Sequence, residues 1–199
     1  DRDLPSLKEL YRDYFDFGCA LTGREAQSKE LMDFYASQFN IMTHGNELKP
    51  DFVLDVARSA QLSQQDPGAV AIRLDAARPL LNYAQAHHIK VHGHVLLWHN
   101  QTPEAFFREN YSRTSPYVSR EVMLSRMENY IRLVLDQTQR EYPGVIVSWD
   151  VVNEAIDDNT GKLRQSNWTR VVGEDFILQA FRFARKYAPE GMQLYYNDY

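Results

Sequence analysis

Residues 142–156, YPGVIVSWDVVNEAI, decide the fold of this chain. A Pro-Gly break is followed by a run of β-branched and apolar residues, which is typical of a buried strand. The run closes on two polar side chains, Asn153 and Glu154. In a (β/α) barrel the catalytic groups stand at the carboxyl ends of parallel strands, so Glu154 is a catalytic candidate. In the simpler interpretation, Glu154 only begins the next loop, where it is solvated or caps a helix.

Four further segments have the character of short apolar strands. They are residues 15–21, 39–43, 89–97 and 192–196. Between the strands, apolar residues recur at steps of three and four, which predicts helices. The expected helices are 4–14, 28–38, 51–61, 75–88, the segment from the N-cap Ser119 to the break at Pro143, and 175–187.

This alternation of strands and helices predicts parallel βαβ units with right-handed crossovers. Five units are present, whereas a closed eight-stranded barrel needs about 250 residues. We therefore expect an α/β fold in which residues 1–199 form the N-terminal five-eighths of one (β/α)8 TIM barrel catalytic domain, without its C-terminal strands. An open doubly wound sheet is the alternative. Against it, no Gly-rich phosphate loop follows the first strand, and polar clusters follow the other four.

Composition excludes several classes of protein. Of 199 residues, 44% are hydrophobic and 13% aromatic, which is enough for a sizeable core. The net charge of -5 comes from interspersed charges, so neither a nucleic-acid stripe nor a polybasic membrane anchor is expected. The first residues, DRDLPSL, contain no signal-peptide core, which fits a cytosolic protein or a mature exported one. Cys19 is the single cysteine and is expected to be a small buried residue.

The polar clusters after the strands suit a sugar. They read HGNELKP at 44–50, WHNQTP at 98–103 and NDY at 197–199. Aromatic faces stack on pyranose rings, while amides and cations bind hydroxyl groups. Cleavage of a glycoside needs two carboxyl groups, and Glu154 is a candidate for the one that protonates the leaving oxygen. Such an acid must keep its proton near neutral pH, which requires partial burial and a second carboxylate nearby.

Four ordered motifs carry a resemblance to a known family. They are GNELK at 45–49, GHVLLWHNQ at 93–101, WDVVNE at 149–154 and NDY at 197–199. Together they resemble glycoside hydrolase family 10, the retaining endo-β-1,4-xylanases. The resemblance spans nearly the whole chain, and four motifs in order are far more specific than any one of them.

The resemblance implies a role for each matching residue. Glu154 matches the general acid/base, and Asn153 the residue that binds the sugar 2-hydroxyl group. Tyr199 matches an aromatic residue on the aglycone side, and the His94-Val95 peptide is a candidate for a cis bond. Contacts to the glycone sugars are implied for Asn46, Lys49, His94, Trp98 and Gln101. Xylan and xylo-oligosaccharides are the implied substrates, no cofactor or metal is implied, and a secreted or periplasmic mature chain is expected.

The chain departs from the family pattern in two places. Gly45 stands where many members have glutamate, so one glycone contact is missing. The nucleophile of the family is a glutamate at the end of the seventh strand, beyond the five strands present here. The histidine of the sixth strand and the aromatic residues of the eighth are missing for the same reason. Double displacement therefore requires the remaining strands, which a complementary C-terminal polypeptide could supply.

Other interpretations stay open from the sequence. A non-catalytic xylan-binding fragment would keep the glycone contacts, and a β-1,4-glucanase would use the same barrel. A zinc hydrolase could use His92 and His94, although no carboxylate or lysine follows at metal-ligand spacing. Several motif residues also have purely structural interpretations: Trp98 and Trp149 as core aromatics, Lys49 as a solvated lysine, and Asp150 as a hydrogen-bonding group inside the barrel.

Overall fold

Five parallel strands form one sheet in the computed structural model, which describes residues 4–199. The strands are β1 (Gly18–Leu21), β2 (Ile41–His44), β3 (Lys90–Trp98), β4 (Ile146–Asn153) and β5 (Gln193–Asn197). They lie in the order β1-β2-β3-β4-β5, and each neighbouring pair is parallel. A doubly wound sheet would change direction at a switch point, so this sequential order is that of a barrel wall. The predicted class is confirmed and the doubly wound alternative is wrong. Residues 1–3 of the expected domain lie outside the described residues.

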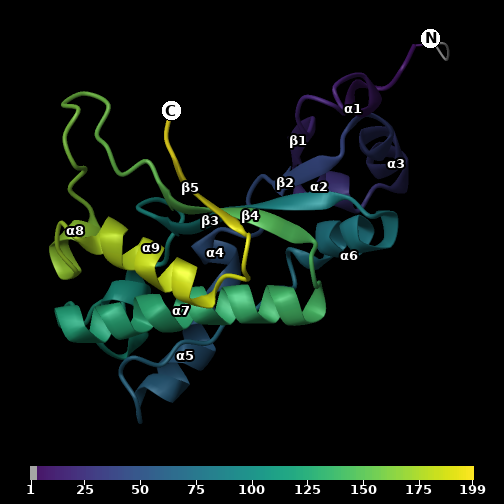
Figure 1. Cartoon of the computed structure of the whole chain (residues 1–199). Helices are drawn as coiled ribbons and strands as arrows, with labels where there is room; N and C mark the ends of the chain where they lie inside the picture. Colours follow the sequence, from purple (N-terminus) through teal and green to yellow (C-terminus); the bar gives the residue numbers. More distant parts are fainter. Residues whose placement is uncertain (1–3) are drawn as a thin grey trace.

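Helices connect the strands and pack outside the sheet (Figure 1). The α-helices are α1 (Leu7–Leu10), α2 (Gly23–Ala26), α3 (Lys29–Gln38), α4 (Pro50–Val53), α5 (Val56–Ser63), α6 (Arg78–His87), α7 (Arg120–Glu141), α8 (Asn167–Val171) and α9 (Phe176–Tyr187). Two 3-10 helices, η1 (Glu104–Phe107) and η2 (Glu109–Tyr111), lie in the loop after β3. Helices α7 and α9 lie side by side, and α9 also contacts β4. The helices between consecutive strands therefore return the chain to the start of the next strand.

The predicted helices differ from the structure in three places. Helix 4–14 shrinks to Leu7–Leu10, followed by turns. Helix 51–61 is two helices, because Asp55 breaks the run and its carboxylate caps α5 by accepting from the amide of Arg58. The short helices α2 and α8 were missed. Each begins with a capping box, at Thr22 and Ser166 respectively, which is the local signal that could have revealed them.

The core centres on β4, where seven of eight residues are buried. Trp149 is fully buried, which confirms its interpretation as a core aromatic. Its indole occupies the space beside Gly93, where an added Cβ would lie 2.2 Å from the ring. The long helix α7 starts where the sequence predicts, with the Ser119 hydroxyl accepting from the amide of Val122. Cys19 is half-buried in β1, and burial, then the charge of Glu25, raises the pKa of its thiol to about 11.

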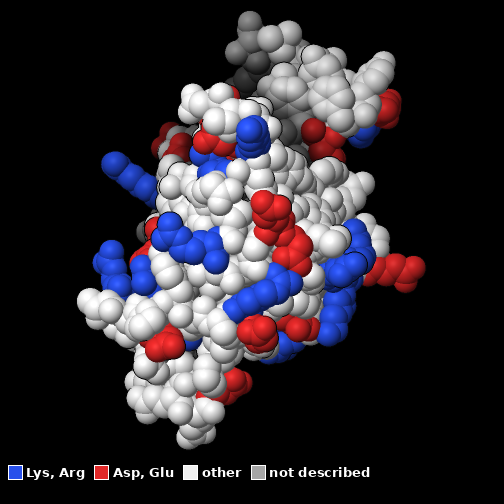
Figure 2. Space-filling view, turned by 90° about the vertical axis from the view of Figure 1, so that its left-hand side faces the viewer, with Lys and Arg blue, Asp and Glu red and all other residues white. Residues whose placement is uncertain are grey.

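The surface carries both signs of charge. On the face shown in Figure 2, lysine and arginine side chains are interspersed with aspartate and glutamate. No helix within residues 4–199 is long and apolar enough to cross a membrane.

Candidate active site

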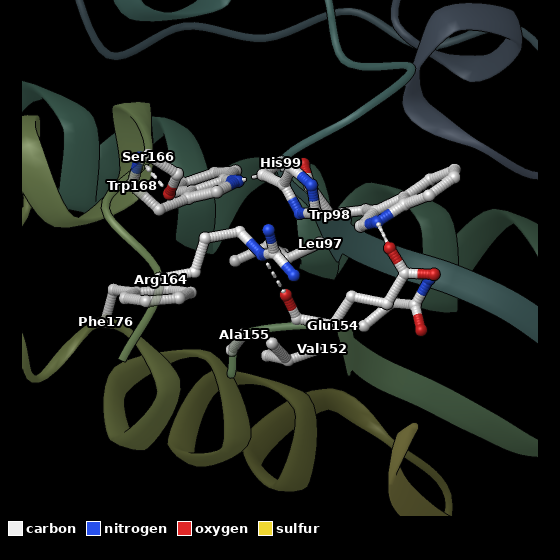
Figure 3. A pocket seen from close by; sticks show the side chains of 11 residues that line it. Leu97, Trp98, His99, Val152, Glu154, Ala155, Arg164, Ser166, Trp168 and Phe176 are labelled. Carbon is white, nitrogen blue, oxygen red and sulfur yellow. Dashed lines mark hydrogen bonds between the residues drawn. The ribbon is translucent and has the colours of Figure 1, made fainter. Parts of the chain in front are cut away.

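The carboxyl ends of β3, β4 and β5 meet in one row. The register pairs Trp98 with Asn153 and Asn153 with Asn197. The carboxylate of Glu154, the residue after β4, accepts a hydrogen bond of 2.9 Å from the indole Nε1 of Trp98 (Figure 3). Asn153 is buried, and its Oδ1 accepts from Asn197 Nδ2 at 2.9 Å. The strand ends therefore bring together the residues that the sequence singled out from distant motifs.

A second cluster lies beside Trp98, at the ends of β2 and β3. Lys49 Nζ donates to Asn46 Oδ1 at 3.0 Å and to Gln101 Oε1 at 2.9 Å, and it stands 4.9 Å from the centre of the Trp98 ring. Lys49 is 9% exposed, so its interpretation as a solvated surface lysine is wrong. Burial lowers the pKa of Lys49, an effect that the carboxylates of Glu47 and Glu154 oppose. Four of the predicted glycone contacts, Asn46, Lys49, Trp98 and Gln101, thus form one polar and aromatic surface.

The fifth predicted contact, His94, belongs to a group inside the barrel. Its Nδ1 lies 2.8 Å from Asp150 Oδ2, and His92 Nε2 lies 3.0 Å from the same oxygen. Burial of Asp150 favours its neutral form, but hydrogen bonds from His92 and His94 outweigh that effect and hold its pKa below the ordinary value. Asp150 is therefore a hydrogen-bonding group inside the barrel, as predicted. The His94-Val95 peptide is cis, which also confirms the prediction.

The zinc interpretation finds no ligand set. The imidazoles of His92 and His94 both contact the carboxylate of Asp150. His92 Nδ1 also lies 2.7 Å from the hydroxyl of Ser148. In the part of the chain that the structure describes, no group of three or more His, Cys, Asp or Glu side chains could hold a metal ion.

Glu154 sits in a left-handed backbone conformation, with φ of 53°. This region is uncommon for residues other than glycine, and it recurs at functional sites. The carbonyl oxygen of Glu154 accepts from Arg164 Nε at 2.9 Å, and its amide donates to the carbonyl oxygen of Asn197 at 2.9 Å. Figure 3 shows the Arg164 side chain reaching this carbonyl group from the loop before α8. A small pocket lined by Trp98, Glu154 and Arg164 lies here, with His99 on its wall.

Sequence reasoning missed three residues of this region: His99, Arg164 and Glu47. Burial, followed by the positive charge of Arg164, lowers the pKa of His99, and its buried Nδ1 has no hydrogen-bond partner among the described residues. Glu47 is buried and accepts from the amides of Gly23 at 2.7 Å and Asn46 at 3.2 Å. Its position between Asn46 and Lys49 in one motif was the available signal. Arg164 stands in a polar loop, where no spacing rule marks it.

Tyr199, the predicted aglycone aromatic, lies beside Glu154. Partial desolvation, and then the carboxylate of Glu154, raises the pKa of its phenol. Its side chain is 82% exposed, which leaves the ring face open to solvent.

Comparisons with known proteins agree with this geometry. Residues 6–199 match the model of glycosyl hydrolase family 10. Endo-1,4-beta-xylanase B of Butyrivibrio fibrisolvens is 42% identical over 194 residues, which cover 98% of this chain and 30% of that protein. The exoglucanase XynX of Acetivibrio thermocellus is 36% identical over 200 residues, which are 99% of this chain and 17% of that protein.

The similarity extends to solved structures. The CBM22-1 and GH10 modules of Clostridium thermocellum endo-1,4-beta-D-xylanase 10B, crystallised with xylohexaose, superpose with a TM-score of 0.88 at 34% identity. The match covers 98% of this chain and 40% of that one. The chain thus spans less than half the length of each of these three proteins.

Proposed function

The chain belongs to glycosyl hydrolase family 10, and we propose that it forms the acid/base half of a retaining endo-1,4-β-xylanase. The family fold is a (β/α)8 barrel, and this chain covers its N-terminal part with five parallel strands. One observation carries the proposal. The carboxylate of Glu154, at the end of β4, is bound by Trp98, whose ring also borders the Lys49 cluster. A proton donor and a sugar-binding surface are therefore adjacent.

In the proposed reaction Glu154 protonates the departing glycosidic oxygen while a glutamate of the remaining strands attacks the anomeric carbon. Glu154 then removes a proton from the water that releases the glycosyl intermediate, so it acts first as acid and later as base. The Trp98 N–H donates to Oε2, which favours the proton on the other oxygen, Oε1. In this proposal Asn153 binds the 2-hydroxyl group, an interaction that strengthens in the transition state.

The proposed sugar contacts divide between two sides of Glu154. Asn46, Lys49, His94, Trp98 and Gln101 would bind the glycone sugars, and Tyr199 would stack on the aglycone. Xylan and xylo-oligosaccharides are the proposed substrates. Because xylan is a polymer too large to enter a cell, we propose that the protein acts on it as a secreted or periplasmic enzyme.

The nucleophile must come from outside the five strands described. Strands β1 and β5 each pair with one neighbour within residues 4–199, and the side chains of Tyr195 and Tyr196 in β5 are 45% and 39% exposed. Closing the barrel requires further strands between these two edges. We propose that a C-terminal polypeptide, continuous or separate, pairs with both edges and supplies the nucleophile.

A β-1,4-glucanase is the second candidate. The 36% identity to the exoglucanase XynX over 99% of this chain supports it, although the identity to the xylanase of B. fibrisolvens is higher, at 42%. A non-catalytic xylan-binding fragment is the third candidate.

The test compares the chain alone with a completed barrel. Residues 1–199 would be assayed for reducing sugar release from xylan and from carboxymethylcellulose, alone and joined to the last three β/α units of the B. fibrisolvens relative. Intact mass would show whether natural preparations hold a second polypeptide of about 100 to 200 residues. We expect no hydrolysis by the chain alone and preferential hydrolysis of xylan by the completed barrel. Preference for the cellulose derivative would favour the glucanase, and a folded barrel that binds xylan without cleaving it would favour the binding fragment.

A further inference from the structure

The three-residue turn that starts at Glu154 has all six of its backbone polar groups bound. The three carbonyl oxygens accept from one residue, Arg164: Glu154 O from Nε at 2.9 Å, Ala155 O from the backbone amide at 2.7 Å, and Ile156 O from a terminal guanidinium nitrogen at 3.0 Å. The three amides donate to the end of β5 instead. A non-glycine residue in the left-handed region is strained, and such a turn persists only when its surroundings hold it.

The phenol oxygen of Tyr196 accepts hydrogen bonds from two of these amides. Its oxygen accepts from Ala155 N at 3.0 Å and from Ile156 N at 3.2 Å, while Glu154 N donates to Asn197 O at 2.9 Å. The hydroxyl hydrogen of Tyr196 is donated to the carboxylate of Asp198. A phenol has one donor and two acceptor positions, so each of them is used.

Asp198 determines the direction in which the hydroxyl hydrogen of Tyr196 points. Desolvation, and then the hydrogen bond to the Asp198 carboxylate, raises the pKa of Tyr196, so the hydroxyl keeps its hydrogen at neutral pH. With that hydrogen directed to Asp198, only lone pairs remain for the two amides. The carboxylate thus makes the phenol an acceptor at the place where the turn presents donors.

We propose that Tyr196, oriented by Asp198, is a positioning residue for the acid Glu154. This inference rests on the proposed role of Glu154 in the function above. Tyr196 contacts the two residues after Glu154, so it acts through the turn. Arg164 binds the carbonyl oxygens of the same turn, and Trp98 donates a hydrogen bond to the side-chain carboxylate of Glu154. Small displacements of a proton donor reduce rates strongly, because proton transfer needs hydrogen-bonding geometry.

The kinetic test uses Tyr196→Phe in the completed barrel. The variant keeps the ring and removes the oxygen that accepts hydrogen bonds from the amides of Ala155 and Ile156. We expect kcat/KM for xylo-oligosaccharides, whose leaving groups need protonation, to fall about tenfold. For an aryl xylobioside with an activated leaving group the fall should be less than about twofold. Asp198→Ala should shift both values in the same direction by a smaller factor, because the phenol then loses its orientation but not its oxygen.

The matched control is Tyr187→Phe. The phenol of Tyr187 also donates to a carboxylate, Glu128, but it joins α9 to α7 outside the barrel. This control should leave both substrates unchanged. An equal loss on both substrates, or no loss on either, in Tyr196→Phe would overturn the positioning role.

Hydrogen exchange gives a readout that does not depend on activity. The amides of Ala155 and Ile156 should exchange about tenfold faster in Tyr196→Phe than in the unaltered barrel, and the Tyr187→Phe control should not change them. Unchanged exchange would overturn the proposal even in an active enzyme. If exchange accelerates but the unaltered barrel hydrolyses no glycan, the turn is held as described and it is the proposed function that fails.

Discussion

Strands β4 and β5 are neighbours that both end in asparagine, but their surroundings are opposite. In β4 Trp149, Val151 and Val152 are at most 1% exposed, whereas Tyr195 and Tyr196 of β5 are 45% and 39% exposed. The difference lies in the number of neighbours, because β4 pairs on both edges and β5 on one edge within the described residues. Glu154 therefore follows a strand that is already packed on both edges. The open edge is where, in the proposed function, the nucleophile side of an eight-stranded barrel would join.

The first prediction concerns the packed centre, meaning β3, β4 and Glu154. The substitution removes a chemical group there and leaves the packing intact. Glu154→Gln keeps a side-chain oxygen that can accept from Trp98 but removes the transferable proton. In the completed barrel we expect kcat/KM on xylan to fall by about 10³-fold, within the range for loss of a general acid. The kcat/KM for an aryl xylobioside with an activated leaving group should fall far less, because departure of that leaving group needs no protonation. Equal loss on both substrates would remove the acid role from Glu154.

The second prediction compares one glycine of the packed centre with one at the open edge. In Gly93→Ala the new Cβ would lie 2.2 Å from the fully buried ring of Trp149, which has no room to move. We expect a loss of about 3 kcal/mol in the free energy of unfolding, measured by urea denaturation of the chain.

Gly18→Ala is the matched substitution at the edge. Its Cβ would meet Ile41 Cγ2 at 2.7 Å and Ile41 O at 2.9 Å, but β1 pairs on one side only in the described chain and can shift. The expected loss is about 1 kcal/mol. Equal losses in the two variants would mean that the edge is packed as rigidly as the centre, contrary to the comparison.

The packed centre is also what the sequence predicts best. The run 142–156 contains β4, and Ser119 marks the start of α7, because long apolar patterns and caps are local signals. The short helices α2 and α8 were missed since four or five residues carry no readable period. Arg164 and the phenol of Tyr196 act on residues 8 to 41 positions away through hydrogen bonds, and such contacts are decided by the tertiary fold.

The resemblance to the family reached further than the periodicity did. It singled out Asn46, Lys49 and Gln101, which the structure joins through hydrogen bonds between loops some 50 residues apart. It gave no role to Glu47, which joins this loop to the first residue of α2. A family motif names residues that contact substrate more readily than residues that hold them in place.

The third prediction addresses the side of the site next to the β1 edge and has the smallest expected effect. Gly45 N donates to Leu21 O at 2.8 Å, and an added Cβ would lie 3.3 Å from the same oxygen, so a side chain needs a shift of only a few tenths of an ångström. Gly45→Glu would restore the carboxylate that many family members carry here. One added hydrogen bond is worth about 1 kcal/mol, so KM for xylo-oligosaccharides should fall about fivefold with kcat unchanged. Gly45→Ala introduces the same Cβ without the carboxylate and should leave KM unchanged. If both variants shift KM equally, the effect comes from backbone rigidity at this edge, and the missing carboxylate is not what separates this side of the site from the packed centre.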